Sequence, residues 1–439
     1  METQTNVTPS GKIGKWSSVS LVVGNMIGAG IFLTPAVLAS YGGISLLGWL
    51  MSTLGAVFIA LLFSRLSKLI PNAQGGIYAY TRDGLGEFPA FMVSWGYWFS
   101  NLTTNAALVV AFISYLSVLI PFVNQSAVTS AAFAILTVWL LTWVNTFSLK
   151  KVGQLATVTT ILKTLPIIAI SVAGLFLFQA SHFQPFNLSG QSDWQAIVAA
   201  TAVTFFSYLG IESATIPSQG IRDPEKTIPF ATRWGTTIAA LIYILSSFSV
   251  MGLVSPVDLA SSTAPFADAA AVIWGEEARY FVGFAGAISA FGALNGWILI
   301  MGQVQQATAN DGLAPSIFKK TNKNQMPAIG LLISAVLITF LIVTNYSGGL
   351  LKVFQFMILV STVSVLIPYL LCAISYAAIV KKLNPSKALS RDTLLIVILS
   401  SAFSLYALFG SGFDSVFWGL LFLVAGIPVF LFLKKRHHE

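Results

Sequence analysis

The sequence of 439 residues is poor in charged residues, cysteine and histidine. Charged residues make up 9% of the chain, whereas soluble domains carry about 25%, so these residues cannot cover the chain with a water-facing surface. The single cysteine, Cys372, lies in an apolar run, which excludes a disulfide or a cysteine metal site within one chain. His182 lies in a connection and His437 and His438 in the terminal tail. We therefore expect no metal and no other cofactor.

Further absences exclude other classes of function. No set of serine, histidine and acid lies within the apolar runs, so no catalytic residues and no enzyme activity are expected. No Walker lysine follows Gly75 and Gly76, which leaves coupling to ATP unsupported. The first fourteen residues are polar and lack the pattern of a removable signal peptide. The net charge of +8 would suit nucleic acid in a soluble protein, but its charges lie in short clusters between apolar runs, so no nucleic acid partner is expected.

Long apolar runs are what the sequence has in abundance. Hydrophobic residues make up 56% of the chain, and the mean hydropathy is +0.82. A helix of about 20 apolar residues crosses the hydrocarbon core of a bilayer. We predict an all-α integral membrane protein, embedded in the lipid bilayer as a single transmembrane domain over residues 1–439. Its twelve expected spans are 15–38, 45–64, 88–120, 127–147, 154–178, 194–217, 228–254, 268–308, 326–345, 350–380, 393–412 and 414–433.

The basic residues predict the orientation of these spans. Most of the 23 lysines and arginines fall at the termini or in even-numbered connections, while Arg279 and Lys352 fall in odd-numbered ones. The positive-inside rule therefore places both termini in the cytoplasm. Lys163 and Glu212 are exceptions, because they fall inside spans five and six. A charge inside the membrane is costly enough to mark a functional site.

Two spans contain sequences that interrupt a helix. Span one has three glycines within Gly24–Gly30, and span six has Gly210 within Ser207–Ser213, followed by Pro217. Glycine costs a helix about 1 kcal/mol relative to alanine. These spans occupy matching positions in two five-span repeats, at about 15–178 and 194–380, and spans eleven and twelve follow at about 393–433. An odd number of spans inverts the second repeat, and paired breaks of this kind indicate the binding site of a transporter.

The chemistry of these breaks favours an α-amino acid as ligand. Amides of Gly28, Ala29 and Gly30, at the start of a half-helix, would offer donors and a positive dipole end to a carboxylate. Carbonyls left free where the first half-helices end would suit an ammonium group. Alternatively, the glycines serve only close packing of helices. The matching break in span six favours the binding site.

Four motifs resemble the amino acid, polyamine and organocation transporter superfamily. They are GNMIGAGIF at 24–32, GGIYAY at 75–80, FFSYLGIESAT at 205–215 and NGWILIMGQ at 295–303. The resemblance extends from about residue 12 to the last span, and it is strongest to the basic amino acid/polyamine antiporter branch, which includes the arginine/agmatine antiporter. It implies a LeuT-like inverted-repeat fold with two added helices, frequently a homodimer, in the plasma membrane, which is the inner membrane of a bacterium.

The resemblance also implies roles for individual residues. Ala29 and Gly30 fall on the carboxylate-binding loop, and Ile27 would contribute a carbonyl. Glu212 falls on the acid of span six. A carboxyl group buried there could be a proton acceptor or a gate, or alternatively a structural acid bonded to freed amides. The remaining substrate and gate positions fall on Phe206, Trp297, Asn105, Ser361, Tyr97 and Tyr78.

Three positions depart from the arginine/agmatine antiporter. That antiporter has tryptophan where Phe206 stands, serine where Ala29 stands and an uncharged residue where Lys163 stands. Phenylalanine is a weaker cation–π partner than tryptophan. Several superfamily members carry a lysine at the position of Lys163, where its ammonium group replaces a bound sodium ion. The alternatives for Lys163 are a neutral amine or a pair with Glu212.

These observations predict a secondary active transporter of an amino acid or its amine product. Exchange is the first choice, because the resembling branch consists of exchangers, and sodium-independent proton symport is the alternative. Lys163 and Glu212 cancel in charge, so a neutral zwitterion fits at least as well as a cationic substrate. A channel or a non-transporting receptor is a further alternative, but a channel needs a continuous polar lining, and polarity here is concentrated at two breaks.

Overall fold

The computed structural model describes residues 13–147, 149–345, 349–386 and 388–438. Within these ranges the chain is helical, and its only β-type pairing is an isolated bridge between Ile13 and Ile221. The α-helices are α1 Lys15–Met26, α2 Ala29–Ala39, α3 Ser45–Leu69, α4 Ile77–Leu85, α5 Glu87–Leu119, α6 Ala127–Val144, α7 Leu149–Leu177, α8 Asp193–Phe205, α9 Pro224–Leu253, α10 Pro256–Ser261, α11 Pro265–Trp274, α12 Glu276–Asn310, α13 Ala328–Asn345, α14 Leu350–Leu383, α15 Arg391–Gly410 and α16 Phe413–His438. Short 3-10 helices are η1 Gly42–Ile44, η2 Pro121–Asn124, η3 Ala180–Phe183, η4 Phe206–Tyr208, η5 Ser218–Gly220 and η6 Ser316–Lys319.

Many of these helices have the length and composition of membrane spans. In the described part of the chain nine segments qualify: α1 with α2, η1 with α3, and α5, α6, α9, α12, α14, α15 and α16. Shorter apolar helices run over Lys163–Leu177, Ala328–Thr344 and Pro265–Trp274. Large apolar side chains such as Phe176 and Phe409 are exposed on the outside of the bundle, as expected for a surface that faces lipid. The prediction of an all-α, multi-pass membrane protein is confirmed.

Two predicted spans have different boundaries in the structure. Span six was expected over 194–217, but α8 ends at Phe205, and η4 and a series of turns follow. Gly210 has φ +108°, a conformation that no α-helix contains. Span eight was expected from residue 268, but α12 begins only at Glu276, because residues 265–274 form the separate helix α11. Gly275, with φ +88°, separates the two helices.

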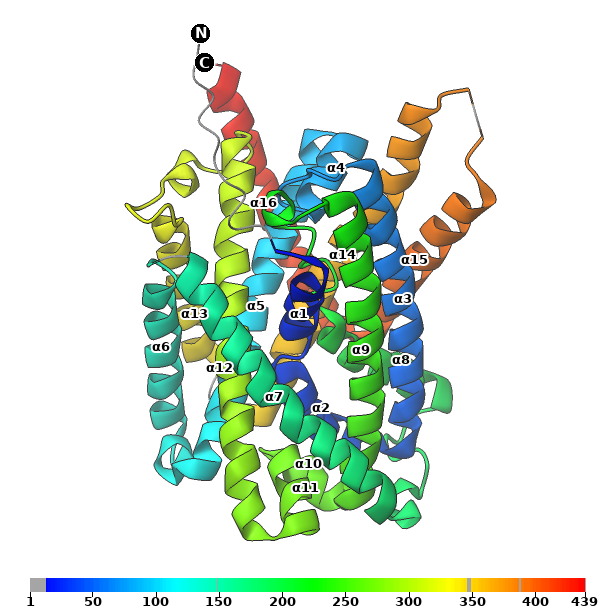
Figure 1. The fold of residues 1–439 in the computed structure, drawn as a ribbon, viewed down its shortest axis with the longest axis vertical. Coiled ribbons are helices and arrows are strands. Elements are labelled where there is room, and N and C mark those ends of the chain that lie inside the picture. The colour runs from blue at the N-terminus through cyan, green and yellow to red at the C-terminus, as the bar shows by residue number, and fades with distance from the viewer. Residues whose placement is uncertain (1–12, 148, 346–348, 387, 439) are drawn as a thin grey trace.

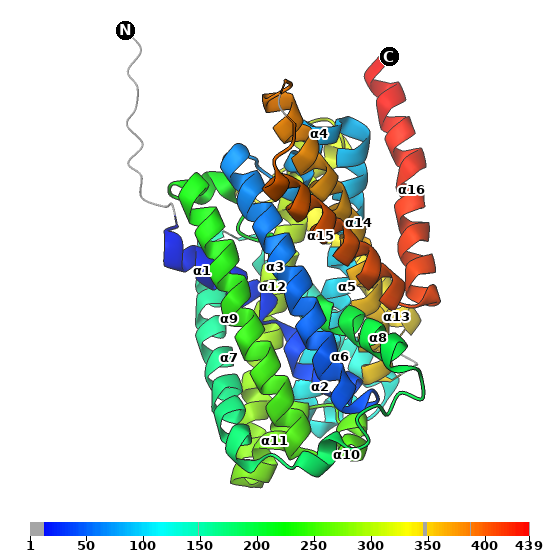
Figure 2. The ribbon, with the colours of Figure 1, turned by 90° about the vertical axis from the view of Figure 1, so that its right-hand side faces the viewer.

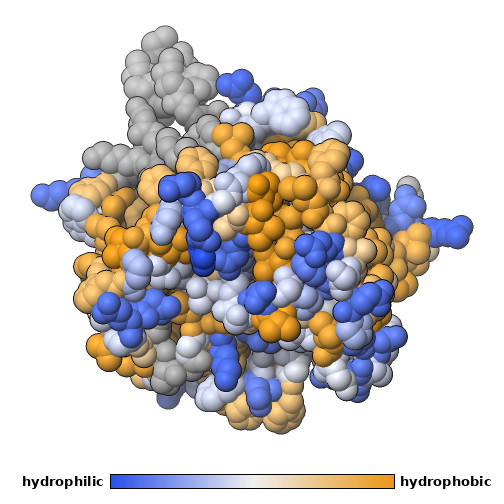
Figure 3. All heavy atoms as spheres, turned by 90° about the horizontal axis from the view of Figure 1, so that it is seen from below, coloured by the Kyte–Doolittle hydropathy of each residue, from blue (hydrophilic) through white to orange (hydrophobic). Residues whose placement is uncertain are grey.

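Three long helices form the middle of the bundle. α5 packs most extensively against α12 and α14, and α3 packs against α8 and α9. The short pair α1 and α2 lies within this arrangement, and α15 and α16 stand at its margin (Figures 1 and 2). α4 and the end of α16 lie at one end of the molecule, whereas α10 and α11 lie at the opposite end, where hydrophilic and hydrophobic residues are interspersed (Figure 3).

The start of α1 is attached to the segment that follows the second break. The amide of Ile13 donates to the carbonyl of Gly220 at 2.9 Å, and the amide of Arg222 donates back to Ile13 at 3.0 Å. The Trp16 ring meets the edge of Phe230, in the first turns of α9, at 5.4 Å between centroids. These contacts hold the start of α1 beside the segment that follows the second break.

The α10–α11 region packs against α2. The Tyr115 hydroxyl donates to the carbonyl of Phe32 at 2.9 Å and accepts from the amide of Phe266 at 3.2 Å. The Phe32 ring also packs against the ring of Phe266 at 5.3 Å. Helix α11 is therefore attached to the first turn of α2, close to the start of that helix.

Candidate functional site

The first break lies between α1 and α2. α1 ends at Met26 and α2 begins at Ala29, so the first amides of α2 have no acceptor within the helix. The amide of Gly28 donates to the carbonyl of Met26 at 2.7 Å. Gly28 was one of the three amides expected to meet a carboxylate, and its amide is therefore already paired. The side chain of Ala29 is not among those that the structure describes.

The second break packs directly against the first, and glycine makes the approach close. A Cβ on Gly210 would lie 3.3 Å from Cβ of Asn25, and one on Gly30 would lie 3.0 Å from Oγ of Ser207 and 3.2 Å from Cδ1 of Phe206. A side chain at either glycine would force its neighbours on the facing break to shift by a few tenths of an ångström. The glycines therefore bring two interrupted segments, far apart in sequence, into contact.

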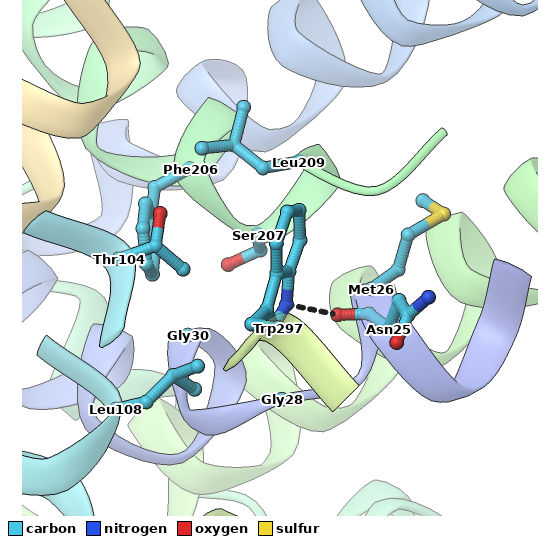
Figure 4. Close-up of a pocket in the computed structure, with 10 residues that line it drawn as sticks. All are labelled: Asn25, Met26, Gly28, Gly30, Thr104, Leu108, Phe206, Ser207, Leu209 and Trp297. Atoms are coloured by element: carbon cyan, nitrogen blue, oxygen red, sulfur yellow. Dashed lines mark hydrogen bonds between the residues drawn. The ribbon is translucent and has the colours of Figure 1, made fainter. Parts of the chain in front are cut away.

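A small pocket lies at this junction (Figure 4). Its volume is about 10 Å³, which is room for about one water molecule. The Trp297 indole donates to the carbonyl of Asn25 at 3.3 Å, with Asn25 and Met26 on one side of the ring and Phe206 on the other. The residues that line it are Asn25, Met26, Gly28, Gly30, Thr104, Leu108, Phe206, Ser207, Leu209 and Trp297.

Two polar groups of this lining have no hydrogen-bond partner in the described structure. They are Nδ2 of Asn25 and Oγ of Ser207, and both are buried. A buried polar group without a partner costs about 1–3 kcal/mol. An amide donor and a hydroxyl beside free helix-end amides can satisfy the oxygens of a carboxylate, whereas the two aromatic rings suit an apolar or cationic side chain.

Ser361 and Asn105 lie next to the pocket without lining it. Oγ of Ser361 lies 2.9 Å from Oγ of Ser100 and 2.6 Å from Oγ1 of Thr104, and Thr104 does line the pocket. The Asn105 amide donates to the carbonyl of Asn101 at 2.9 Å. Ser361 can therefore act on a ligand through Thr104. Ile27 is buried and does not line the pocket, although its neighbours Met26 and Gly28 do.

Glu212 joins three parts of the bundle. The Tyr97 hydroxyl donates to Oε1 of Glu212 at 2.6 Å, the amide of Gly210 donates to Oε2 at 3.3 Å, and the Tyr369 hydroxyl donates to the same Oε2. All three side chains are buried. The carboxyl group therefore connects the second break to α5 and α14, and any change in its charge or position acts on all three elements.

Lys163 meets the first break. Its ammonium group donates to the carbonyl of Gly24, in the last turn of α1, at 2.6 Å, and the residue is 1% exposed. Within the described residues no ion pair links Lys163 to Glu212, so a Lys163–Glu212 pair is not what holds either side chain.

Tyr78 belongs to a separate cluster at the end of α12. Its hydroxyl donates to Oδ2 of Asp311 at 2.9 Å, and Arg82 forms an ion pair with the same oxygen at 2.5 Å. Burial, and then the Asp311 carboxylate, raise the pKa of Tyr78, so this phenol stays protonated and donating. α4 is thereby attached to the end of α12, away from the pocket.

Comparison with known proteins gives the family. Residues 13–433 match the sequence model of the family described as amino acid permease. The chain belongs to this family. This permease is 30% identical over 428 residues to the putrescine transporter PotE of Haemophilus influenzae, covering 97% of this chain and 98% of the relative. It is 34% identical over 346 residues, 77% of each chain, to a cadaverine/lysine antiporter of Escherichia coli. It is also 27% identical over 428 residues, 97% of each chain, to PotE of Escherichia coli.

These matches confirm the predictions of a membrane transporter and of a chain without enzyme activity, because the family and these relatives are transporters. In the permease, no group of three or more histidine, cysteine, aspartate or glutamate residues within the described ranges has the arrangement of a metal site.

Sequence reasoning missed several residues of this site in the permease. Thr104 and Ser207 are ordinary hydroxyl residues in apolar surroundings, and Tyr369 is one of twelve tyrosines. A signal was available for Tyr369 alone, because a tyrosine in the middle of an apolar run needs a buried partner. Asp311 and Arg82 gave no such signal, since charges at helix ends are common.

Proposed function

We propose that this permease is a secondary active transporter that exchanges an amino acid for an amine. The observation that carries this proposal is the pocket where two interrupted segments meet, with the start of helix α2 and two aromatic rings around it. The exchange itself is supported by relatives named as a cadaverine/lysine antiporter and as putrescine transporters. A pocket of about 10 Å³ must widen to admit an amino acid, which is consistent with alternating access.

The substrate would bind with its two ends at different elements. Its carboxylate would meet the amides of Ala29 and Gly30 and the side-chain amide of Asn25. Its α-amine would meet backbone carbonyls of Ile27 and Phe206, and its side chain would lie against the rings of Phe206 and Trp297. An amine product lacks the carboxylate, so it would rely on the carbonyls and the aromatic faces. An exchanger has to bind both substrates at one site, and this arrangement offers contacts to each of them.

We propose twelve spans arranged as two inverted repeats of five, with both termini in the cytoplasm. The matched breaks at 27–28 and 206–217 support the repeats, and the distribution of lysine and arginine supports the orientation. In this orientation the α4 end faces the cytoplasm and the α10–α11 end faces outward. Residence in a bacterial inner membrane agrees with the bacterial relatives, and the homodimer stays a prediction.

Counterflow in liposomes tests the exchange. Purified protein is reconstituted with unlabelled lysine, ornithine, arginine, cadaverine or putrescine inside, and uptake of the same labelled compounds is measured. We expect uptake only when a substrate is present inside, with an amino acid on one side exchanging for its amine on the other. Equal uptake into empty liposomes would contradict exchange, and acceleration of that uptake by an inward proton gradient would favour the second candidate.

Proton-coupled symport without sodium is that second candidate. The contact between Lys163 and the carbonyl of Gly24 favours it, because a lysine that can exchange a proton would attach to or release the first half-helix as its charge changes. Glu212, bonded across three elements, would provide a second group whose charge controls packing. Both candidates use the same pocket and differ in how the carrier returns: it carries the counter-substrate in exchange, and it returns empty in symport.

Lys163 gives a direct prediction about sodium. Replacing sodium by potassium outside the liposomes is expected to leave uptake by the natural protein unchanged, since the ammonium group already meets the carbonyl of Gly24. Lys163→Met is expected to lose transport by roughly tenfold or more, because a charged hydrogen bond contributes about 1.5–3 kcal/mol. Lys352→Met, at an exposed lysine of α14, is the control and should transport normally. Uptake that rises with sodium would contradict the assigned role.

A further inference from the structure

Two adjoining cavities lie away from the central pocket, where α5 and α16 meet the segment between α12 and α13. The larger has a volume of about 340 Å³ and the smaller about 280 Å³. They share Leu313, and α16 contributes Val429 to the larger and Phe430 and Lys434 to the smaller. α16, which contributes residues to both cavities, stands at the margin of the bundle (Figure 2), so the cavities lie at this margin.

The larger cavity has apolar walls, and the polar groups beside it already have partners. The Trp95 indole donates to the carbonyl of Phe422 at 2.7 Å, and the Trp98 indole donates to Oγ of Ser334 at 2.9 Å. Oγ of Ser94 lies 2.6 Å from Oγ1 of Thr308. An occupant of this cavity finds hydrocarbon and aromatic faces, which suit an apolar chain. The walls are formed by residues such as Phe91, Trp95, Trp98, Ile317, Phe318 and Val429.

The smaller cavity carries charges of both signs. Asp311 is already neutralised by Arg82 at 2.5 Å. Glu87 and Lys434 also line the cavity, and neither takes part in an ion pair among the described residues. One carboxylate and one ammonium group at the same cavity are complementary to a ligand that carries a phosphate and an ammonium group together.

The order of the two cavities along α5 matches the order of groups in a phospholipid. Glu87 is the first residue of α5, and Trp95 and Trp98 follow after roughly 12 and 17 Å at 1.5 Å per residue. Tryptophans concentrate at the level where headgroups give way to acyl chains. The charged cavity therefore lies at the helix ends, and the apolar cavity lies on the hydrocarbon side of it.

We propose that the two cavities together bind one glycerophospholipid whose zwitterionic headgroup carries a primary ammonium group. Its phosphate would meet Lys434, its ammonium group would meet Glu87, and the upper part of one acyl chain would occupy the cavity lined by Trp95 and Trp98. An anionic headgroup has no ammonium group of its own to meet the carboxylate of Glu87. A quaternary ammonium group could not donate hydrogen bonds to the carboxylate.

Thermal unfolding of the delipidated protein in detergent tests this proposal. Phosphatidylethanolamine is expected to raise Tm at lower concentrations than phosphatidylglycerol or phosphatidylcholine. Glycerophosphoethanolamine, which lacks acyl chains, is expected to have little effect. Lys434→Gln and Glu87→Gln are each expected to weaken the apparent affinity for phosphatidylethanolamine roughly tenfold, as expected for loss of one charged hydrogen bond.

Matched variants make the result decisive. Lys435→Gln removes the neighbouring exposed charge, which does not line either cavity, and should leave the affinity unchanged. Val429→Trp fills the apolar cavity and should abolish the Tm shift while preserving Tm without lipid. Equal shifts with the three phospholipids, equal effects of Lys434→Gln and Lys435→Gln, or a full shift in a folded Val429→Trp variant would each overturn the proposal.

Discussion

Glu212→Gln is expected to reduce substrate exchange roughly 10- to 100-fold, because a buried charged hydrogen bond contributes about 1.5–3 kcal/mol. The carboxylate accepts from the hydroxyls of Tyr97 and Tyr369 and from the amide of Gly210. Glutamine keeps one acceptor oxygen and replaces the other by a donor, so one side of this three-way contact is lost. The second break then separates from α5 or from α14.

Counterflow of preloaded substrate over a range of pH measures this effect. Tyr97→Phe and Tyr369→Phe each remove one donor, and we expect smaller losses that do not add, since both hydroxyls act on one carboxyl group. Tyr376→Phe, at a buried tyrosine about two turns further along α14 than Tyr369, is the matched control and should transport normally. If exchange survives in both Glu212→Gln and Lys163→Met and shows no pH dependence, neither residue carries the coupling.

Gly30→Ala is expected to weaken substrate affinity about 5- to 150-fold, since forcing a methyl group into a packed site costs typically 1–3 kcal/mol. The added Cβ would lie 3.0 Å from Oγ of Ser207 and 3.2 Å from Cδ1 of Phe206. It would therefore occupy the junction of the two breaks and displace the ring that we propose covers the substrate.

The apparent affinity for external substrate in liposomes measures this change. Gly14→Ala is the matched control, because a Cβ there would meet no atom within 4 Å, and it should behave as the natural protein does. Normal affinity in Gly30→Ala, with protein that is monodisperse and reconstitutes to the same level, would show that the substrate does not bind at this junction.

The contacts around the two breaks explain why these effects should be large. The first break is held by Lys163 at Gly24, and the second by Tyr97 and Tyr369 at Glu212. Each attachment joins an interrupted segment to a long continuous helix. A substrate that enters between the breaks has to shift at least one segment, so the strength of these attachments decides how readily the carrier changes state.

The positions of the breaks could be predicted from sequence because their signal is local. Three glycines within Gly24–Gly30, and Gly210 followed by Pro217, oppose a continuous helix wherever they occur. The structure has α1 ending at Met26 and α8 ending at Phe205. The extent of the second interruption could not be predicted, because the sequence stays apolar through it. For the same reason, hydropathy averaged along the sequence misplaced the start of span eight.

The partners of the polar side chains could not be predicted, because they come from distant parts of the sequence. Tyr369 lies 157 residues from Glu212, and Asp311 lies 233 residues from Tyr78. The resemblance placed Tyr97, Glu212 and Tyr78 in gating roles without saying which of them meet. In the structure Tyr97 meets Glu212, and Tyr78 belongs to another cluster at the end of α12.

The sequence by itself determined that this protein lies in a membrane, that most of its chain forms apolar helices, and that two of its spans are interrupted. These properties depend on hydropathy and on the backbone freedom of glycine, which act over a few turns of helix. Only the tertiary structure decided that the two breaks face each other around Trp297, that Glu212 joins three elements, and that Glu87 and Lys434 line one cavity. Such contacts depend on how distant helices pack, and no local pattern encodes that packing.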